Sequence, residues 1–267
     1  MRDSFDRAIR YLRVSVTDRC NLRCLYCAPP EEARRLAAVE LLSFDDIARI
    51  VEAAVGLGVD KVRLTGGEPL ARAGIVELVS RLAGIPGLKT LCMTTNGTLL
   101  APLAAALKAA GMASLNVSLD TLDPDRYESL TGGGSLAAVF EGVDAALEAA
   151  LPVKLNIVVL GEGREAEAEA EEVERYARER SASSQRIRMY DLRLPKSEDS
   201  RYDRPPACGG CDRMRLLADG RLKPCLHSDI AVRVDMDDIE DCLLACAAMK
   251  PERGGVCTTL GVGQIGG

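Results

Sequence analysis

The sequence contains no tryptophan, and aromatic residues make up only 3% of its 267 residues. Proteins that bind single-stranded nucleic acid stack the bases on aromatic side chains, so this composition argues against that class. The net charge is −6, and lysine and arginine form no tract. This argues against a general polyanion-binding surface but leaves room for a small phosphate pocket. We therefore expect no nucleic-acid partner.

Long apolar runs are also missing. Apolar residues make up 47% of the chain, but no run approaches the roughly 20 residues of a membrane-spanning helix. The N-terminal stretch MRDSFDRAIRYLR lacks the apolar core of a secretory signal peptide. We expect no membrane association and a cytoplasmic location.

Histidine is nearly absent, since His227 is the single one, whereas the chain has ten cysteines. In a reducing compartment, clustered cysteines bind metals or act in catalysis more often than they form disulfides. Six of the ten lie in two clusters, Cys20, Cys24 and Cys27, and Cys208, Cys211 and Cys225. The other four (Cys92, Cys242, Cys246 and Cys257) are interpreted as packed thiols.

Short runs typical of strands alternate with longer helical patterns. Strands are predicted at Tyr11–Val16, Lys61–Thr65, Thr90–Thr94, Ser114–Leu119, Val153–Val159 and Arg186–Asp191. Helices are predicted from an N-cap at Ser43 to about Gly56, and over Ile75–Ala83, Leu99–Ala110, Leu136–Ala150 and Glu162–Arg180. This alternation predicts parallel strands joined by crossover helices, either closed as a barrel or open as a sheet. The proline-bounded segment Pro195–Pro206 reads as a linker, and a second module is predicted from about Cys208.

The first cluster, CxxxCxxC, directly follows the first predicted strand. Structural zinc normally takes four protein ligands, and no fourth cysteine or histidine lies near this loop. An iron–sulfur cube held by three cysteines leaves one iron open to a small molecule. The motif therefore indicates a cluster whose fourth ligand is a substrate or cofactor, with a zinc or disulfide knot as the alternative.

A second motif, LTGGEPL (Leu64–Leu70), also follows a predicted strand. Its glycines let the backbone approach a ligand, and Glu68 can accept from an ammonium group, although GGEP alone is more often an ordinary turn. Together the two motifs resemble those of radical S-adenosylmethionine (SAM) enzymes. The resemblance implies an α/β fold, a partial (β/α)6 TIM-like barrel, with a [4Fe–4S] cluster that chelates and reductively cleaves SAM. It assigns SAM contacts to Tyr26, Gly66, Gly67, Glu68 and Ser118.

The second cluster, Cys208, Cys211 and Cys225, is again an incomplete ligand set. Zinc is a stronger alternative here, because His227 lies two residues after Cys225 and could complete a Cys3His site. Between these cysteines, Arg213 and Arg215 alternate as on a strand and so face one side. Their planar guanidinium groups suit a phosphate.

The whole chain resembles the GTP 3′,8-cyclases of molybdenum cofactor biosynthesis. The resemblance is carried by Ile9–Cys27, Lys61–Arg72, Leu115–Pro124, Cys211–Leu226 and the terminal Gly261–Gly267. It implies that a second [4Fe–4S] cluster binds the guanine of GTP, in an auxiliary C-terminal module. The resemblance therefore predicts two parts of the chain. Residues 1–194 form a radical SAM barrel, and residues 195–267 hold a linker and the auxiliary module with its Gly-Gly tail.

The family's roles transfer to this chain by motif position. Substrate contacts fall on Arg13, Lys61, Arg63, Thr94, Lys154, Arg188, Arg213 and Arg215, and catalytic roles on Arg13, Gly266 and Gly267. The implied reaction is a lyase conversion of GTP to (8S)-3′,8-cyclo-7,8-dihydroguanosine 5′-triphosphate. The implied partners are GTP, a low-potential electron donor of ferredoxin or flavodoxin type, a downstream pyranopterin monophosphate synthase and, as one option, a second copy of the chain.

Two departures from the family keep other functions open. The segment between Arg188 and Cys208 is several dozen residues shorter than in the cyclases, and Arg193 stands where the family has a methionine near the adenosyl group. One alternative is a radical SAM enzyme acting on another substrate, such as a peptide. The other is a non-catalytic iron–sulfur or zinc protein, which would not need the GGEP motif.

Overall fold

The computed structural model describes residues 1–27, 36–37, 40–189, 191–196, 199, 201–203 and 207–260. Its strands are β1 (Tyr11–Ser15), β2 (Lys61–Thr65), β3 (Thr90–Thr95), β4 (Ser114–Ser118), β5 (Val153–Val159), β6 (Ser183–Arg188), β7 (Arg213–Leu216), β8 (Arg221–Lys223) and β9 (Val232–Arg233). Its α-helices are α1 (Phe44–Gly56), α2 (Ile75–Ala83), α3 (Ala104–Ala109), α4 (Pro124–Thr131), α5 (Leu136–Glu148), α6 (Arg164–Glu179) and α7 (Ile239–Ala248). Short 3-10 helices lie at η2 (Pro69–Ala71) and η3 (Ala101–Leu103).

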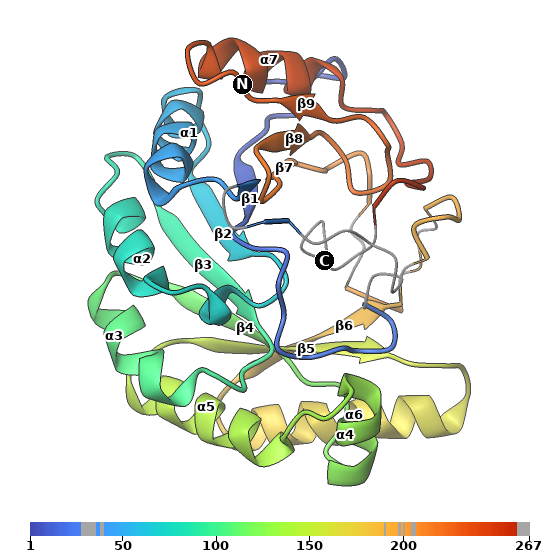
Figure 1. The fold of residues 1–267 in the computed structure, drawn as a ribbon. Helices are drawn as coiled ribbons and strands as arrows, with labels where there is room; N and C mark the ends of the chain where they lie inside the picture. Colours follow the sequence, from blue (N-terminus) through green and yellow to red (C-terminus); the bar gives the residue numbers. More distant parts are fainter. Residues whose placement is uncertain are drawn as a thin grey trace.

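The strands form one sheet in the order β6-β5-β4-β3-β2-β1-β7-β8-β9. From β6 to β1 every neighbouring pair is parallel. Figure 1 shows that the sheet is curved and that α1, α2, α3, α5 and α6 follow one another around its outer side. Parallel strands joined by outer helices confirm the predicted α/β fold with a partial barrel.

The period-two alternation of the strands separates an apolar layer from a polar barrel interior. Leu12 and Val14 of β1 belong to the apolar core, as do Val62 and Leu64 of β2. The residues between them point to the opposite face of the sheet, so Arg13 lies on the interior side of β1. The fold thus places charged side chains inside the barrel while the helices cover the apolar side.

The segment after Cys208 joins the barrel sheet. Strand β7 pairs in parallel with β1, and β8 and β9 continue the sheet in antiparallel pairs. Strand β7 carries Arg213 and Arg215, which lie opposite Tyr11 and Arg13 of β1 in the register. The two arginines therefore share one face, as their spacing predicts, and that face is the barrel interior.

Two predicted elements have other bounds in the structure. Strand β6 covers Ser183–Arg188 instead of Arg186–Asp191, because the polar stretch from Ser183 pairs with β5. The helix predicted over Leu99–Ala110 is divided into η3 and α3. Pro102 lies in the first turn of η3, where its missing backbone N–H costs least.

Sequence reasoning missed α4, although its start has a clear signal. Asp123 is the N-cap and accepts a hydrogen bond from the Arg126 backbone N–H at 2.9 Å, and Pro124 occupies the first helical turn. Both residue types are preferred at those positions. The C-terminal turn of α4 accepts hydrogen bonds from the cysteine loop, from Arg23 N to Thr131 O at 2.8 Å and from Leu25 N to Leu130 O at 3.0 Å.

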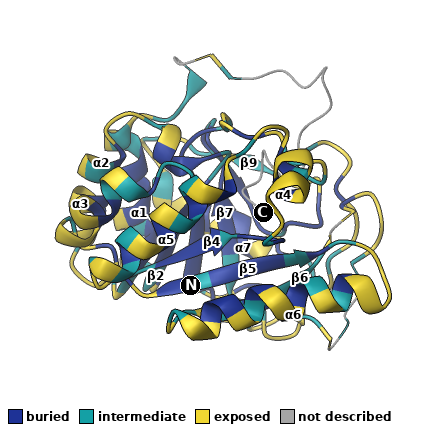
Figure 2. Cartoon of the chain, turned by 90° about the horizontal axis from the view of Figure 1, so that it is seen from below, coloured by how far each residue is buried: buried dark blue, intermediate teal, exposed yellow. Residues whose placement is uncertain are grey.

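The charged helix α6 is amphipathic. Its buried positions are Ala166, Ala170, Val173, Tyr176 and Ala177, the spacing of an apolar stripe that faces the sheet. Figure 2 shows this helix with its exposed residues on the outer side. Among the helices of the described residues, none combines the length and the apolar character needed to cross a membrane.

Removing the α4 N-cap should destabilise the protein. We expect Asp123→Ala to lower the free energy of unfolding by about 1 kcal/mol, because the Arg126 N–H loses its acceptor. Urea unfolding of the metal-free protein measures the change, and Glu128→Ala on the exposed side of the same helix is the control. Equal stability of the two variants would contradict this assignment of the cap.

Candidate active site

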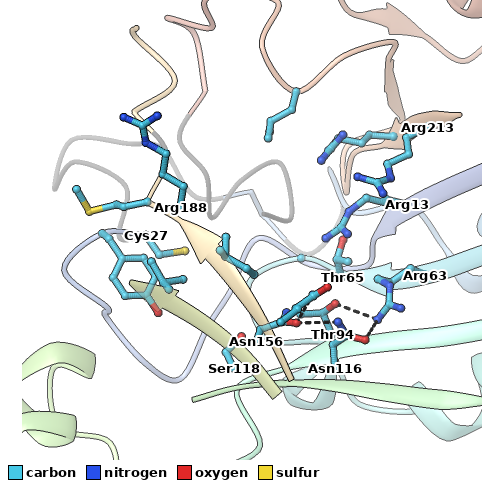
Figure 3. Close-up of a pocket in the computed structure, with 18 of the residues that line it drawn as sticks. Arg13, Cys27, Arg63, Thr65, Thr94, Asn116, Ser118, Asn156, Arg188 and Arg213 are labelled. Atoms are coloured by element: carbon cyan, nitrogen blue, oxygen red, sulfur yellow. Dashed lines mark hydrogen bonds between the residues drawn. The ribbon is translucent and has the colours of Figure 1, made fainter. Parts of the chain in front are cut away.

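A cavity of about 240 Å³ opens at the barrel interior and is lined from both ends of the sequence. Both cysteine triads contribute to its wall, as do the loop after β2 and the ends of β4, β5 and β6. Figure 3 shows Arg13, Arg63 and Arg213 on one side of the cavity and Cys27 and Arg188 on the other. One chamber therefore connects the two candidate metal sites.

The cysteine loop is held by backbone hydrogen bonds to the GGEP loop. Gly67 N donates to Thr17 O and Glu68 N donates to Arg19 O, both at 2.8 Å. A Cβ atom on Gly66 would lie 2.3 Å from Thr17 O, and one on Gly67 would lie 2.1 Å from Arg19 O. Contact this close requires glycine at both positions. The glycine pair thus fixes the backbone that leads directly into Cys20.

Tyr26 and Asp120 tie the other end of the loop to the barrel. The Tyr26 hydroxyl donates to Asp120 Oδ2 at 2.5 Å, and the Val158 backbone N–H donates to Asp120 Oδ1 at 2.7 Å. Burial raises the pKa of Asp120 to about 6. This buried carboxylate links the cysteine loop to β5 through one side chain.

The three thiols of the loop lie in a setting that disfavours their ionisation. Burial, neighbouring thiols and Asp120 raise the pKa of Cys24 to about 12, and burial, Cys20 and Asp120 raise that of Cys27 to about 11. Burial also raises the pKa of Cys20. A cationic metal centre would relieve this cost by stabilising the thiolates. The donor set, three cysteines without a fourth ligand, fits a cluster with one open iron.

Glu68 is buried, with 1% of its surface exposed, beside the first triad. Its carboxylate accepts from Leu70 N at 3.0 Å, Thr95 Oγ1 at 2.7 Å and Asn96 N at 2.7 Å. Burial nevertheless raises its pKa to about 7. These three donors leave Oε2 with room for one more, so a ligand ammonium group could complete the set.

Three arginines lie at one level of the barrel interior. Arg13 is the register partner of Arg63 on β2 and of Arg215 on β7, and all three are buried. Burial and the charges of Arg215, Arg63 and Arg213 lower the pKa of Arg13 to about 10. Among the described residues that line the cavity, seven are arginine or lysine and a single one, Glu68, is a carboxylate. The chamber is therefore suited to an anion with several charges.

Neutral amides extend the polar interior across the sheet from Arg63 (Figure 3). Arg63 donates to Asn116 Oδ1 at 2.8 Å, and Asn116 donates to Asn156 Oδ1 at 2.7 Å. Gln185 also donates to Asn156 Oδ1, at 2.5 Å. The network fixes the direction of Arg63 and presents polar groups to the cavity from β4, β5 and β6.

The second triad lies among cations. Lys196 Nζ donates to Cys208 Sγ at 3.0 Å, and Gly254 N donates to the same sulfur at 3.4 Å. Burial alone would raise the pKa of Cys211, but Lys250 and Arg213 hold it below its usual range. These groups stabilise thiolates before any metal binds.

The second triad also fits an iron–sulfur cube. Among the described residues, no three cysteine, histidine or carboxylate side chains converge on one point as ligands of a single ion. A cube does not require such convergence, because each thiolate binds a different iron. His227 lines the same cavity, and burial together with Lys196 and Arg215 lowers its pKa to about 4, so its imidazole is neutral at pH 7.

Comparison with known proteins agrees with this arrangement. The Radical SAM superfamily profile matches residues 14–181. A GTP 3′,8-cyclase of Alkaliphilus oremlandii is 38% identical over 320 aligned positions that cover 100% of both chains. A GTP 3′,8-cyclase of Pelotomaculum thermopropionicum is 39% identical over 312 positions, covering 95% of this chain and 94% of its own. The chain belongs to the GTP 3′,8-cyclase family.

Solved structures with low sequence identity share the fold of this family member. Native anSMEcpe with bound AdoMet superposes with a TM-score of 0.67 at 16% identity, covering 88% of this chain and 80% of its own. Streptococcus suis SuiB bound to S-adenosylmethionine gives a TM-score of 0.64 at 18% identity and covers 82% of this chain. The cyclase-family chain spans 60% of the length of SuiB.

Most residues implied by the family resemblance lie in the cavity wall. They are Arg13, Arg63, Thr94, Arg188, Arg213 and Arg215, together with Tyr26, Gly66, Gly67, Glu68, Ser118 and the six clustered cysteines. Lys61 and Lys154 are not among the described lining residues. Lys61 Nζ lies 5.0 Å from the centre of the Tyr11 ring, one level away from Arg13. Gly266 and Gly267 lie outside the described residues, so their role stays a prediction.

The resemblance implies a methionine near the adenosyl group, and this chain has Arg193 at that position. Arg193, which holds the family position in sequence, is exposed and is absent from the described cavity lining. Met189, at the end of β6, lines the cavity and is 50% exposed. Met189 therefore contributes a thioether to the described cavity wall.

Several residues of this cyclase-family site were not singled out from the sequence. Asp120 lies within Leu115–Pro124, which carries the family resemblance, but it has no predicted role, and Asn156 and Gln185 give no signal beyond their interior-facing strand positions. Lys196 and Lys250 also line the cavity. Lys196 comes from the linker and Lys250 follows α7, where no sequence pattern predicts proximity to Cys208 or Cys211.

The raised pKa of Glu68 predicts a specific pH dependence of stability. Because the unfolded carboxyl titrates near 4.5 and the folded one near 7, rising pH removes up to about 3 kcal/mol of unfolding free energy across that window. Glu68→Gln should lack this loss. Urea unfolding of metal-free protein from pH 4.5 to 8 measures it, with Glu141→Gln on exposed α5 as the control. Parallel profiles for wild type and Glu68→Gln would contradict the expectation.

Proposed function

We propose that this protein is a radical SAM lyase that converts GTP to (8S)-3′,8-cyclo-7,8-dihydroguanosine 5′-triphosphate, the first step of molybdenum cofactor biosynthesis. The observation that carries the proposal is the single cavity that joins two cysteine triads across a group of buried arginines. Membership of the cyclase family over the full chain supports it. The concentration of positive charge on the described cavity wall favours a polyanion over a peptide substrate.

The first triad and the GGEP loop form the SAM end of the chamber. Cys20, Cys24 and Cys27 would hold a [4Fe–4S] cluster, which supplies with SAM the one-electron chemistry that starts the reaction. Glu68 would accept from the SAM ammonium group through the vacant acceptor site of its carboxylate. Tyr26, Gly66, Gly67 and Ser118 lie in the same wall and would surround the rest of the cofactor.

The second triad would hold a second [4Fe–4S] cluster with an iron open to the guanine of GTP. Support comes from its three-cysteine donor set and from its place on the same cavity as the first triad. The auxiliary module over residues 195–267 would then complete the active site. Because β7 belongs to the barrel sheet, this module and the barrel form the site jointly.

The arginines would bind the triphosphate and the ribose. Arg13, Arg213 and Arg215 are directed to the chamber from two paired strands, and Arg63 is oriented by Asn116. Arginine guanidinium groups that face an anion in a buried site bind it through short, charge-assisted hydrogen bonds. Thr94 and Arg188 would add contacts from β3 and β6, and Lys61 and Lys154 would contribute longer-range charge. The terminal Gly266 and Gly267, with Arg13, would assist the chemistry.

Other partners follow from the chemistry of the proposed reaction. Reductive cleavage of SAM consumes an electron, so a low-potential donor of ferredoxin or flavodoxin type is required. The cyclic product would pass to a pyranopterin monophosphate synthase. We also propose a homodimer as the assembly to test, by measuring the mass of the protein in solution.

Iron content tests the two-cluster proposal. Anaerobically reconstituted protein should bind about eight irons, and replacement of Cys20, Cys24 and Cys27 by alanine should leave about four while abolishing SAM cleavage. Metal analysis and assay of 5′-deoxyadenosine measure both. Stoichiometric zinc at the second triad would refute the second cluster.

Substrate specificity is tested by the paired arginines of β7. Arg213→Ala with Arg215→Ala should lower GTP affinity at least tenfold, or about 1.4 kcal/mol, because the triphosphate loses two charge-assisted partners. SAM cleavage without GTP should persist, since the first triad is unchanged. The control removes equal charge from the exposed face of α6, with Arg175→Ala and Arg178→Ala. Equal GTP affinity in both double variants would exclude this phosphate site.

A further inference from the structure

Lys196 has a place in the site that neither the family motifs nor the proposed GTP contacts explain. It lies in the short linker between β6 and Cys208, and its ammonium donates to Cys208 Sγ at 3.0 Å. An ammonium bound to a thiolate forms a charge-assisted hydrogen bond, which is stronger than one between neutral groups. Its target is a sulfur of the second triad rather than the open part of the chamber.

The linker backbone holds Lys196 in this position. Lys196 N donates to Gly255 O at 3.3 Å, and Cys257 N donates to Leu192 O at 2.6 Å. Leu192 and Cys257 are also buried together in a small apolar cluster. Hydrogen bonds and apolar packing thus hold the linker against residues 254–257. Gly254 N, from the same segment, also donates to Cys208 Sγ, at 3.4 Å.

The described surroundings of the first triad differ from those of Cys208. Its described sulfur contacts at Cys20 come from neutral donors, Leu22 N at 3.4 Å and Asn96 Nδ2 at 3.8 Å. Among the described residues, the carboxylate of Glu68 acts on that thiol and the carboxylate of Asp120 acts on Cys24, and each opposes ionisation of the sulfur. The two ends of one chamber therefore have opposite electrostatic surroundings.

We propose that Lys196 is a positioning residue that raises the reduction potential of the second cluster above that of the first. Reduction adds negative charge, and both net charge and hydrogen bonds to the ligand sulfurs set the potential of an iron–sulfur cluster. The ammonium stabilises the reduced state at Cys208, while the carboxylates near Cys20 and Cys24 disfavour it there. This inference rests on the second cluster proposed above.

Redox titration followed by electron paramagnetic resonance tests the inference. The full chain with Cys20, Cys24 and Cys27 changed to alanine isolates the second cluster, and iron analysis first verifies about four irons. In this background Lys196→Met should lower the equilibrium constant for reduction about tenfold, which is about 59 mV for a one-electron couple. Lys196→Gln, which keeps a neutral donor, should have a smaller effect, and Lys196→Arg should remain near wild type.

A matched set with Cys208, Cys211 and Cys225 changed to alanine isolates the first cluster. Lys196→Met should leave the potential of that cluster unchanged. An unchanged second-cluster potential with four irons retained would overturn the inference, as would an equal shift of both clusters. Loss of GTP affinity without a shift in potential would make Lys196 a substrate cation instead. Absence of iron from the second triad would refute the second cluster itself, which the metal analysis reveals before any titration.

Discussion

Positive charge inside the barrel is the feature on which the site depends. Arg13, Arg63 and Arg215 are buried at one level because parallel pairing aligns β2, β1 and β7 in register. Like charges so close repel one another in a medium less polar than water. The protein offsets part of this cost with the hydroxyl of Tyr11 and the amide of Asn116, which accept from Arg63. The remaining positive charge makes the described chamber suited to a polyanion.

The two ends of the chamber use different means to prepare their cysteines. At the first triad, backbone packing is decisive, because Gly66 and Gly67 leave no space for a side chain against residues 17–19. At the second triad, the preparation is electrostatic, with Lys196 and Lys250 close to the thiols. The packing at the first triad fixes the position of the backbone that leads into Cys20. The lysines at the second triad lower the free-energy cost of holding ionised thiolates there.

Much of this could be predicted from the sequence. The two cysteine motifs, the GGEP loop and the β7 arginines are local patterns with a direct chemical meaning, and the strand–helix alternation predicts the barrel. Lys196 and Lys250 could not be placed, since their proximity to cysteines depends on long-range packing. The bounds of β6 were wrong for a related reason. Its polar stretch from Ser183 forms a strand because β5 offers a partner, which is tertiary context overriding local preference.

The pairing of β1 with β7 has a consequence for the order in which the protein matures. Arg13 and its partner Arg215 are separated by about two hundred residues of chain, so this contact has high contact order and forms slowly. During synthesis the strands from β1 to β6 can associate while β7 has not yet emerged. Until β7 arrives, the edge of β1 that carries Arg13 has no strand partner on that side, so the wall of the anion chamber stays incomplete while the first cysteine loop is already synthesised.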